Sequence, residues 1–343
     1  MKLEGNGAVF RSDIAVTNAR FPANNFALLS MPNHRNVKPF LKWAGGKGQL
    51  LPQLQMYFPT ELEKGSIAKY VEPFVGSGAV FFYIAQYYGY LVREFWISDV
   101  NFDLMVTYKT IQQDVEALVE RLSEIQTEYL QKDEAARKAY FYQMRSRFNQ
   151  QRSQPNFREK LQANVERTAQ IIFLNRTCFN GLFRVNSKGE FNVPYGRYKN
   201  PKICYADNLY NIAKVLQKTH IRCGHYTISE SFIDGNSFVY LDPPYRPINK
   251  TSRFTSYSQF VFGDAEQLAL RDFCLRLHAK GAKLMLSNSD PKNENPEDNF
   301  FENAYQGFSL YRLQASRHIN SNKDKRGKIN ELLIANYPVS QNL

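Results

Sequence analysis

The chain has 343 residues, of which 43% are hydrophobic and 22% charged, as in globular proteins with a large core and about two domains. Its 44 Lys and Arg residues against 32 Asp and Glu residues give a net charge of +12, which favours a polyanionic partner such as nucleic acid, although a basic enzyme of another kind explains the charge as well. Its 4 cysteines include no C-x-x-C pair, which speaks against a zinc knuckle and a disulfide scaffold and favours a reduced, cytoplasmic protein.

The first part of the chain, residues 1–37, has weak periodicity and many Asn, Pro and Gly residues, so we expect a loosely ordered extension without a signal peptide. Beyond it, "KYVEPFVGSGAVFFYIAQYY" predicts a strand, a glycine turn and a helix, and "EFWISDVN" predicts a strand that ends on an acid. The longest apolar stretch is interrupted by Gln86 and Gly89 and is shorter than the roughly 20 residues of a membrane span. We therefore expect no membrane segment.

The middle of the chain has a helical pattern. Apolar residues at three- and four-residue spacing predict one long helix in "DLMVTYKTIQQDVEALVERLSEIQTEYLQ", another in "AARKAYFYQMRSRFNQQR" and a more buried one in "ERTAQIIFLNRTCF". In "LFRVNSKGEFNVPYGRY" extended residues flank the turn signal "NSKG", which predicts a hairpin whose charged residues are mostly basic.

After Asn208 the predicted elements alternate between helix and strand. In chain order they are a helix at "NIAKVLQ", a strand at "SFVYLD", a helix at "DAEQLALRDFCLRLHAKG" and strands at "AKLMLSNSD" and "KINELLIANY". This alternation predicts an α/β fold with a doubly wound, mostly parallel sheet. We expect residues 38–102 and 205–343 to form the sheet domain, and residues 103–204 to be a helical and hairpin insertion.

The stretch "VEPFVGSG" places Gly76 and Gly78 between a predicted strand and a predicted helix, where glycines let the backbone approach a ligand closely. Phe81 stands where the dinucleotide fingerprint has its third glycine, which weakens a nicotinamide interpretation. The next predicted strand ends on Asp99, a position suited to ribose hydroxyls. The pattern favours adenosine binding over a purely structural turn.

The stretch "FLKWAGGKGQLL" is not a phosphate-binding P-loop, because Leu41 and Gly48 replace the glycine and the hydroxyl residue that this motif requires. What remains is a glycine turn between Trp43 and Lys47. The indole offers a face for a cation or a purine, and the ammonium offers a charge for a carboxylate. For this stretch by itself, a buried Trp and a solvated Lys are the slightly favoured explanation.

The stretch "FVYLDPPYRP" ends a predicted strand on Asp242, at the edge where open α/β sheets bind ligands. Pro243 and Pro244 fix the backbone and remove two N–H donors, so the turn offers acceptors, the Asp242 carboxylate and the Pro243 carbonyl. Paired acceptors suit an NH₂ group, and Tyr245 adds a face for a planar ring. We therefore favour recognition of an amino group on a heteroaromatic base over a plain strand-to-loop turn.

Several of these stretches together, in this order, resemble the D12 class of DNA adenine-N6 methyltransferases, which includes DNA adenine methylases and the methylases paired with GATC-cutting restriction enzymes. The resemblance covers residues 38–337 and rests on "FLKWAGGK", "VEPFVGSG", "ISDVN", "FNGLFRVNSKGEFNVPYGRYKNP", "VYLDPPY" and "LSNS". It implies the class I fold of methyltransferases that use S-adenosylmethionine, with residues 103–204 as the target-recognition domain. "DPPY" without the other motifs is also found in other amino-methyltransferases.

The resemblance implies S-adenosylmethionine as methyl donor, S-adenosylhomocysteine as product and no metal. The residues that it assigns to the donor are Trp43, Lys47, Glu72, Pro73, Phe74, Gly76, Gly78, Asp99, Tyr226 and Asp242. It makes Asp242, Pro243, Pro244 and Tyr245 the catalytic turn, which receives an adenine flipped out of the duplex.

The resemblance also implies double-stranded DNA as partner and GATC as target site, with a restriction endonuclease acting on the same site. The residues expected at the DNA are Lys42, Phe179, Asn180, Arg184, Lys188, Pro194, Arg197, Phe254 and Tyr257. We expect Arg184 to read a guanine edge, although a phosphate contact is the alternative for Arg184 and Lys188. The alternative functions are methylation of RNA or of a protein amide, and a catalytically silent DNA-binding protein of the same fold.

Overall fold

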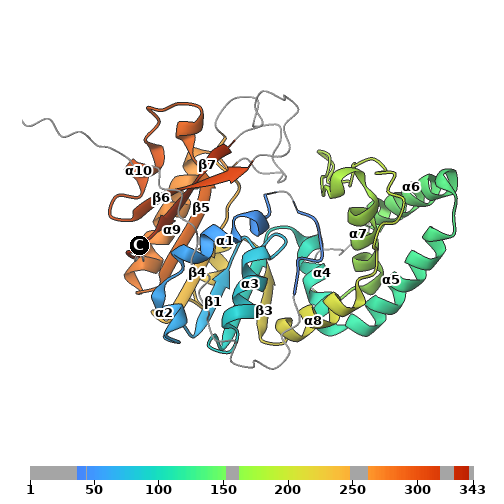
Figure 1. Ribbon diagram of the computed structural model, residues 1–343, viewed down its shortest axis with the longest axis horizontal. Helices are drawn as coiled ribbons and strands as arrows, with labels where there is room; N and C mark the ends of the chain where they lie inside the picture. Colours follow the sequence, from blue (N-terminus) through green and yellow to red (C-terminus); the bar gives the residue numbers. More distant parts are fainter. Residues whose placement is uncertain (1–36, 44, 152–161, 248–261, 317–327, 340–343) are drawn as a thin grey trace, which may run out of the picture. The chain divides into compact units, whose positions relative to one another are not determined.

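The computed structural model describes residues 37–43, 45–151, 162–247, 262–316 and 328–339, and in these ranges seven strands form one sheet in the order β3-β2-β1-β4-β5-β7-β6 (Figure 1). The strands are β1 Lys69–Glu72, β2 Glu94–Asp99, β3 Thr219–Cys223, β4 Ser237–Leu241, β5 Lys283–Ser289, β6 Ser309–Ser316 and β7 Lys328–Ala335. β1 to β5 pair in parallel, while β7 runs antiparallel to both of its neighbours.

The mostly parallel, doubly wound sheet predicted from the sequence is confirmed. Strand order reverses between β1 and β4, which lie side by side with Val71 opposite Val239. In an open α/β sheet such a reversal opens a crevice at the carboxyl ends of the two strands, and ligands bind there. The short strand β3 and the edge strand β6 were not among the predicted elements.

Helices cover both faces of the sheet. The α-helices of the described ranges are α1 Leu51–Leu54, α2 Thr60–Glu63, α3 Ala79–Tyr88, α4 Phe102–Gln113, α5 Val115–Leu130, α6 Glu134–Gln151, α7 Val165–Thr177, α8 Ala206–Leu216, α9 Asp264–Ala279 and α10 Phe300–Ala304. Because successive strand residues point to opposite faces, Phe238 and Tyr240 of β4 join one hydrophobic core, while Val239 and Leu241 join the other. None of the helices in the described ranges has the length and apolar character needed to cross a membrane.

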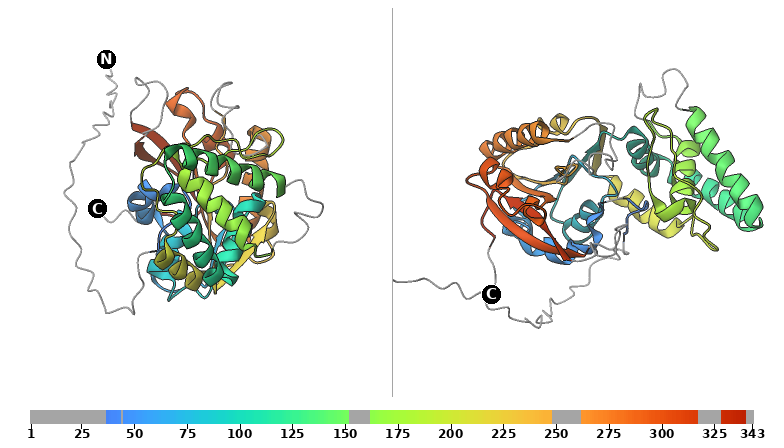
Figure 2. Two further views of the ribbon diagram at one scale, coloured as in Figure 1. Left: turned by 90° about the vertical axis from the view of Figure 1, so that its right-hand side faces the viewer. Right: turned by 90° about the horizontal axis from the view of Figure 1, so that it is seen from above.

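The helices α5, α6 and α7 gather beyond α4 and α8, on the β3 side of the sheet (Figure 1 and Figure 2). The single long helix predicted for residues 103–131 is wrong in one respect, because the backbone breaks at Asp114 (φ −133°, ψ 42°), which ends α4 and begins α5. The core around these helices is continuous with the core on one face of the sheet.

The predicted hairpin around "NSKG" forms, but its pairing is limited to two isolated bridges, Val185 with Phe191 and Cys178 with Tyr195. Asn186 closes the turn, since its carbonyl accepts from the Gly189 N–H at 2.8 Å. A longer ladder is not compatible with Pro194, which has no N–H to donate. Outside the turn, side chains of the helices hold the segment in place.

A buried ion pair joins the helices. The Arg167 guanidinium lies 2.9 Å from the Asp103 carboxylate, and the two side chains are 1% and 3% exposed. Arg167 also donates to the Gln151 side chain at 3.2 Å, and its guanidinium lies 3.4 Å from the ring centroid of Phe148. One cation on α7 therefore fixes α4 and α6 around it.

We expect Asp103→Ala to lower the free energy of unfolding by about 3–5 kcal/mol, because it leaves the Arg167 charge buried without its carboxylate. Urea denaturation measures the loss. The control is Glu124→Ala, which removes a carboxylate that is 59% exposed from its pair with Arg121, and its cost should stay below about 1 kcal/mol. Equal losses in the two variants would contradict this account of the helical block.

Candidate active site

The catalytic turn, residues Asp242 to Tyr245, follows β4 at the crevice between β1 and β4. β4 is buried at all five positions, so the sequence forms a strand until Asp242, where the prolines prevent it from continuing. The glycine loop after β1 lies at the same edge, because the two strands are parallel neighbours. The two motifs that were singled out separately in the sequence therefore meet in the structure.

An ion pair between Lys47 and Asp242 lies in this crevice. The Lys47 Nζ is 2.7 Å from one carboxylate oxygen and 2.8 Å from the other, and it also donates to the Gly45 carbonyl at 3.1 Å. The side chains of Lys47 and Asp242 are 4% and 20% exposed. Burial raises the pKa of the Asp242 carboxyl, and the Lys47 ammonium opposes that rise. The sequence indicated a carboxylate of the donor as the partner of Lys47, whereas in the structure Lys47 pairs with Asp242.

The carbonyl groups of the two prolines differ in their environment. The Pro244 carbonyl accepts from the Gln267 side chain at 3.1 Å, and Gln267 is in turn held by Asn288 at 3.2 Å. The Pro243 carbonyl has no hydrogen-bond partner among the described residues. The turn therefore keeps one carbonyl acceptor available beside the Asp242 carboxylate.

The glycine loop has a backbone that only glycine adopts easily. Gly76 and Gly78 have φ angles of 48° and 73°. A Cβ on Gly78 would lie 2.5 Å from the Tyr108 hydroxyl, and one on Gly76 would lie 3.2 Å from the Trp43 ring. The loop thus forms a cradle next to the Trp43 indole, as the adenosyl part of a donor requires.

Asp99 ends β2 beside this cradle. One carboxylate oxygen accepts from the Gly76 N–H at 3.2 Å and the other from the Asn101 N–H at 2.9 Å. Burial raises the pKa of the Asp99 carboxyl, and the backbone N–H groups of Asn101, Gly76 and Val100 oppose the rise. Each oxygen retains a second lone pair, so Asp99 fits the predicted role of accepting from ribose hydroxyls.

The other residues predicted at the donor lie in or below this loop. Glu72 is 2% exposed and accepts from the Tyr70 hydroxyl at 2.7 Å, and burial raises its pKa well above the usual range. Pro73 is buried behind it. The Phe74 ring packs 5.3 Å from the ring of Tyr226, which is 4% exposed, so Tyr226 supports Phe74 and has little surface of its own for a ligand.

The residues predicted at the DNA are connected to the donor side by Asn175, which the sequence analysis did not single out. The Asn175 side chain accepts from the Lys42 N–H at 2.8 Å and donates to the Lys42 and Gly181 carbonyls at 2.9 and 2.8 Å. Next to it, the Phe183 ring stacks on Trp43 with a centroid distance of 5.3 Å. These are long-range contacts, which no local motif signals.

The predicted recognition residues in the described ranges are exposed, and all of them except Lys42, which precedes β1, lie in the segment after α7. Phe179 is 53% exposed, and Asn180 has a left-handed backbone with φ 56°. The Arg184 Nε donates to the Asn192 side chain at 2.9 Å. The two terminal nitrogens of Arg184 donate no hydrogen bond within the described part of the chain. The other exposed members are Lys42, Lys188, Pro194 and Arg197. Phe254 and Tyr257 lie outside the described residues.

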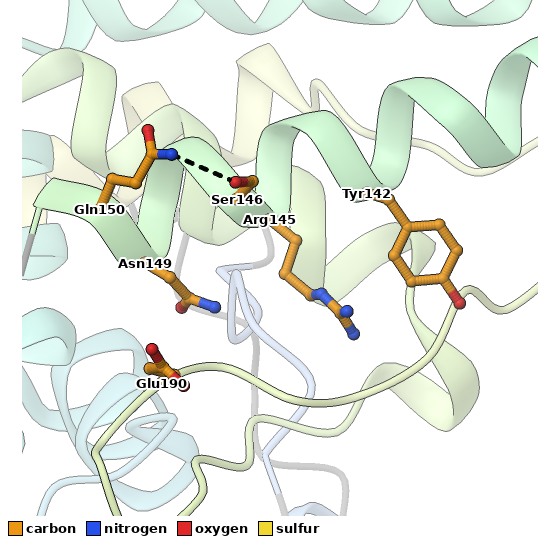
Figure 3. Close-up of a pocket in the computed structure, with 6 residues that line it drawn as sticks. All are labelled: Tyr142, Arg145, Ser146, Asn149, Gln150 and Glu190. Atoms are coloured by element: carbon orange, nitrogen blue, oxygen red, sulfur yellow. Dashed lines mark hydrogen bonds between the residues drawn. The ribbon is translucent and has the colours of Figure 1, made fainter.

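A polar cavity of about 310 Å³ lies between α6 and this hairpin (Figure 3), and none of its lining residues belongs to the catalytic turn. It is lined by Tyr142, Arg145, Ser146, Asn149, Gln150 and Glu190. The Asn149 side chain donates to the Phe191 carbonyl at 3.1 Å and accepts from its N–H at 2.8 Å. The α6 wall of the cavity therefore fixes the position of the hairpin. Over the described ranges, no group of three His, Cys, Asp or Glu side chains has the arrangement of a metal site.

The chain is similar to known DNA methyltransferases over most of its length. Residues 43–319 match the family model described as D12 class N6 adenine-specific DNA methyltransferase. The chain is 50% identical over 302 residues to the type II methyltransferase M.MjaIII of Methanocaldococcus jannaschii. The aligned region covers 88% of this chain and 99% of the relative. It is 36% identical over 311 residues to the type II methyltransferase M1.LlaDCHI of Lactococcus lactis subsp. cremoris, with 90% and 99% covered. It is 34% identical over 301 residues to the DNA adenine methylase of Escherichia coli, with 88% and 96% covered.

We expect Lys47→Met to destabilise the protein by up to about 3 kcal/mol at pH 7, because it leaves the Asp242 carboxylate without its cation. The variant raises the folded-state pKa of Asp242 further above its unfolded value. The unfolded chains titrate alike, so the deficit relative to wild type grows as pH rises through the range between the folded-state pKa of Asp242 in wild type, which burial already raises, and its higher folded-state pKa in the variant. Chemical denaturation at several pH values measures the deficit.

The matched control is Lys69→Met, which breaks an ion pair with Asp234 whose side chains are 24% and 46% exposed. Its cost should be below about 1 kcal/mol. Adding Asp242→Asn to Lys47→Met should remove the pH dependence. A deficit that is the same at every pH would show that the Asp242 charge is not the cause.

Proposed function

Because the chain belongs to the D12 class of N6 adenine-specific DNA methyltransferases, we propose that it methylates adenine at N6 within GATC sites of duplex DNA, after extruding the base. The observation that carries the proposal is the catalytic turn, where the Asp242 carboxylate and the Pro243 carbonyl lie next to the Tyr245 ring, and that carbonyl has no hydrogen-bond partner within the described ranges. These are the two acceptors and the stacking face that an adenine amino group requires.

The methyl donor that the family implies is S-adenosylmethionine, which supplies an electrophilic methyl group when bound. The glycine cradle of Gly76 and Gly78, the Asp99 carboxylate and the Trp43 ring fit its adenosyl part. Lys47 is available to its carboxylate only if it gives up part of its contact with Asp242. We therefore infer that donor binding and release of Asp242 are coupled through Lys47.

The amino group of the target adenine cannot reach the turn from within a duplex, so the base has to leave the stack at a cost of a few kcal/mol. Tyr245 then offers a face on which the base stacks. The Asp242 carboxylate and the Pro243 carbonyl accept the two N6 hydrogens, which aims the nitrogen lone pair away from the turn. As positive charge develops on N6, the carboxylate stabilises it and is placed to take the proton that N6 releases.

We assign recognition of the DNA target sequence to the exposed segment after α7. The terminal nitrogens of Arg184 suit the O6 and N7 acceptors of a guanine, and Asn192 holds the guanidinium at its other side. We assign to Phe179 and Asn180 the filling of the gap that the extruded base leaves, and to Pro194 the contact with a thymine methyl. The preference for GATC rests on the resemblance of the whole segment to GATC-methylating enzymes.

Two of the relatives are named type II methyltransferases, which supports a restriction endonuclease of the same specificity as functional partner. Other relatives are named DNA adenine methylases, which supports a role without one. In either case the substrate is DNA, so the enzyme is expected to work in the cytoplasm, where that DNA is accessible.

We expect Asp242→Asn to lower kcat by at least about a hundredfold, since the side chain keeps its size but loses the charge that stabilises the reacting nitrogen. Incorporation of label from the donor into duplex DNA measures kcat. Binding of the duplex, followed by anisotropy, should remain within about threefold of wild type. Unimpaired turnover in this variant would exclude the proposed role of the turn.

We expect Arg184→Ala to reduce the preference for GATC over duplexes with one changed base pair by about tenfold to a hundredfold, because one bidentate base contact is lost. The matched control is Lys188→Ala on the same hairpin, which should weaken methylation of all duplexes to a similar degree. The values of kcat/KM on a panel of duplexes distinguish the loss of a base contact from the loss of a phosphate contact. A uniform loss in the Arg184 variant would make it a phosphate contact.

A further inference from the structure

Strand β7 brings a second carboxylate to the active-site edge of the sheet. Because β7 runs antiparallel to β5, its first residues lie where the parallel strands end, and Glu331 is opposite Ser289, the last residue of β5. The sequence predicts a strand at "KINELLIANY", and no local motif signals a role for its acid. The antiparallel direction of this one strand is what makes Glu331 a neighbour of the catalytic turn.

Glu331 contacts the turn through Tyr245. The Tyr245 hydroxyl donates to the Glu331 carboxylate at 2.8 Å. The other end of the side chain joins the backbone of Tyr245, which directly follows the two rigid prolines. The Lys47 ammonium lies 4.9 Å from the ring centroid. A tyrosine side chain attached only at its Cα has several staggered rotamers, so a bond to the hydroxyl at the far end selects one position of the ring.

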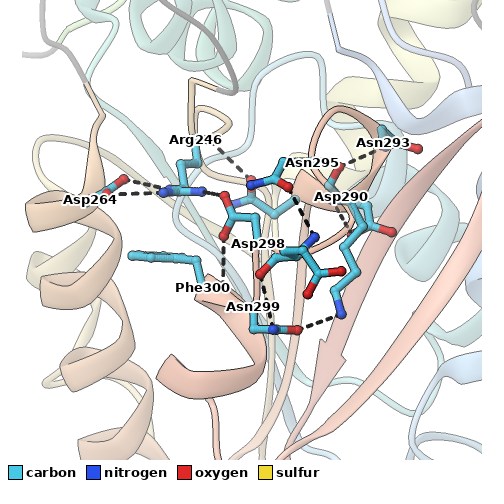
Figure 4. A network of polar contacts seen from close by, with 11 residues as sticks. Arg246, Asp264, Asp290, Asn293, Asn295, Asp298, Asn299 and Phe300 are labelled. Carbon is cyan, nitrogen blue, oxygen red and sulfur yellow. Dashed lines mark hydrogen bonds and ion pairs between the residues drawn. The ribbon is translucent and has the colours of Figure 1, made fainter.

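The backbone on both sides of Tyr245 is already held. The Pro244 carbonyl is bonded to Gln267, and the Arg246 N–H donates to the Asn288 side chain at 3.3 Å. The Arg246 guanidinium then pairs with Asp264 and Asp298, each at 2.6 Å (Figure 4). With the main chain fixed in this way, the freedom that remains at this position is rotation of the ring.

The surroundings of Glu331 contain a further polar group. The Ser289 hydroxyl is buried and has no hydrogen-bond partner among the residues that the structure describes.

Burial of Tyr245, with two carboxylates nearby, raises the pKa of its hydroxyl well above the usual range, so the hydroxyl stays protonated and remains a donor to Glu331. The contact is thus a charge-assisted hydrogen bond, which is stronger than one between neutral groups.

We propose that Glu331 is a positioning residue, which sets the plane of the Tyr245 ring on which the extruded base stacks. The inference rests on the proposed function, because it needs Tyr245 to be the stacking face. Glu331 acts through the tyrosine hydroxyl and does not itself contact the base. A residue with this role affects turnover and the stacking of the base, and leaves the affinity for the donor unchanged.

The test uses four variants of the full chain: Glu331→Ala, Glu331→Gln, Tyr245→Phe and the double variant of Glu331→Ala with Tyr245→Phe. Glu331→Ala and Tyr245→Phe each break the same hydrogen bond, so each should lower kcat by about tenfold to a hundredfold. The double variant should be no slower than either single variant, because the two changes remove one interaction. Glu331→Gln retains an acceptor for the hydroxyl and should recover activity to within about fivefold of wild type.

A second readout reports on the base itself. A duplex with 2-aminopurine at the target position fluoresces when the base leaves the stack and is quenched when it stacks on an aromatic ring. In Glu331→Ala we expect brighter emission than in wild type with the same duplex affinity and the same donor KM. The control Glu94→Ala, a carboxylate 49% exposed at the start of β2, should match wild type in both readouts.

The proposal is overturned if the losses of kcat in the two single variants multiply in the double variant. It is also overturned if Glu331→Gln is as slow as Glu331→Ala, or if Glu331→Ala is fully active. A structural role alone would change the unfolding free energy and leave kcat of the folded protein intact. If wild type does not methylate adenine in duplex DNA, the proposed function has failed, and this outcome is separate from the behaviour of the Glu331 variants.

Discussion

The burial of the Asp242 carboxylate at the end of β4 is the constraint on which the rest of the site depends. A carboxylate in such a place tends to lose its charge, and the Lys47 ammonium, with both oxygens within 2.8 Å, opposes that tendency. The same ammonium lies over the Tyr245 ring. One cation therefore connects the segment before β1 to both functional side chains of the turn.

The topology of the sheet explains why these groups meet. The parallel neighbours β1 and β4 present the glycine loop and the catalytic turn at a single edge. The antiparallel strand β7 adds Glu331 to that edge from the opposite direction, and β5 adds Asn288 and the hydroxyl of Ser289. Beyond the sheet, Asn175 and the stack of Trp43 on Phe183 connect the residues proposed to bind the donor with the segment proposed to read DNA. A shift of that segment on binding DNA can therefore move Trp43 and Lys42 through these few contacts.

Local motifs made the central part of the site predictable from the sequence. Glycines at 76 and 78 and the prolines after Asp242 act on the backbone within a few residues, so their effect is readable without the fold. The break at Asp114 was missed because apolar spacing continues across it. The pairing of Lys47 with Asp242, 195 residues apart, and the roles of Asn175 and Glu331 depend on long-range packing that no window of sequence contains. The hairpin was predicted as strands, and the proline in it reduced the pairing to isolated bridges.

The central claim is that the turn offers its paired oxygens to an extruded adenine. The most direct measurement is a crystal structure of the protein with a GATC duplex and an unreactive analogue of the donor. The account predicts the adenine N6 within hydrogen-bond distance of both the Asp242 carboxylate and the Pro243 carbonyl, with the base stacked on Tyr245. An adenine that stays in the duplex, or one bound with its amino group away from this turn, would contradict it.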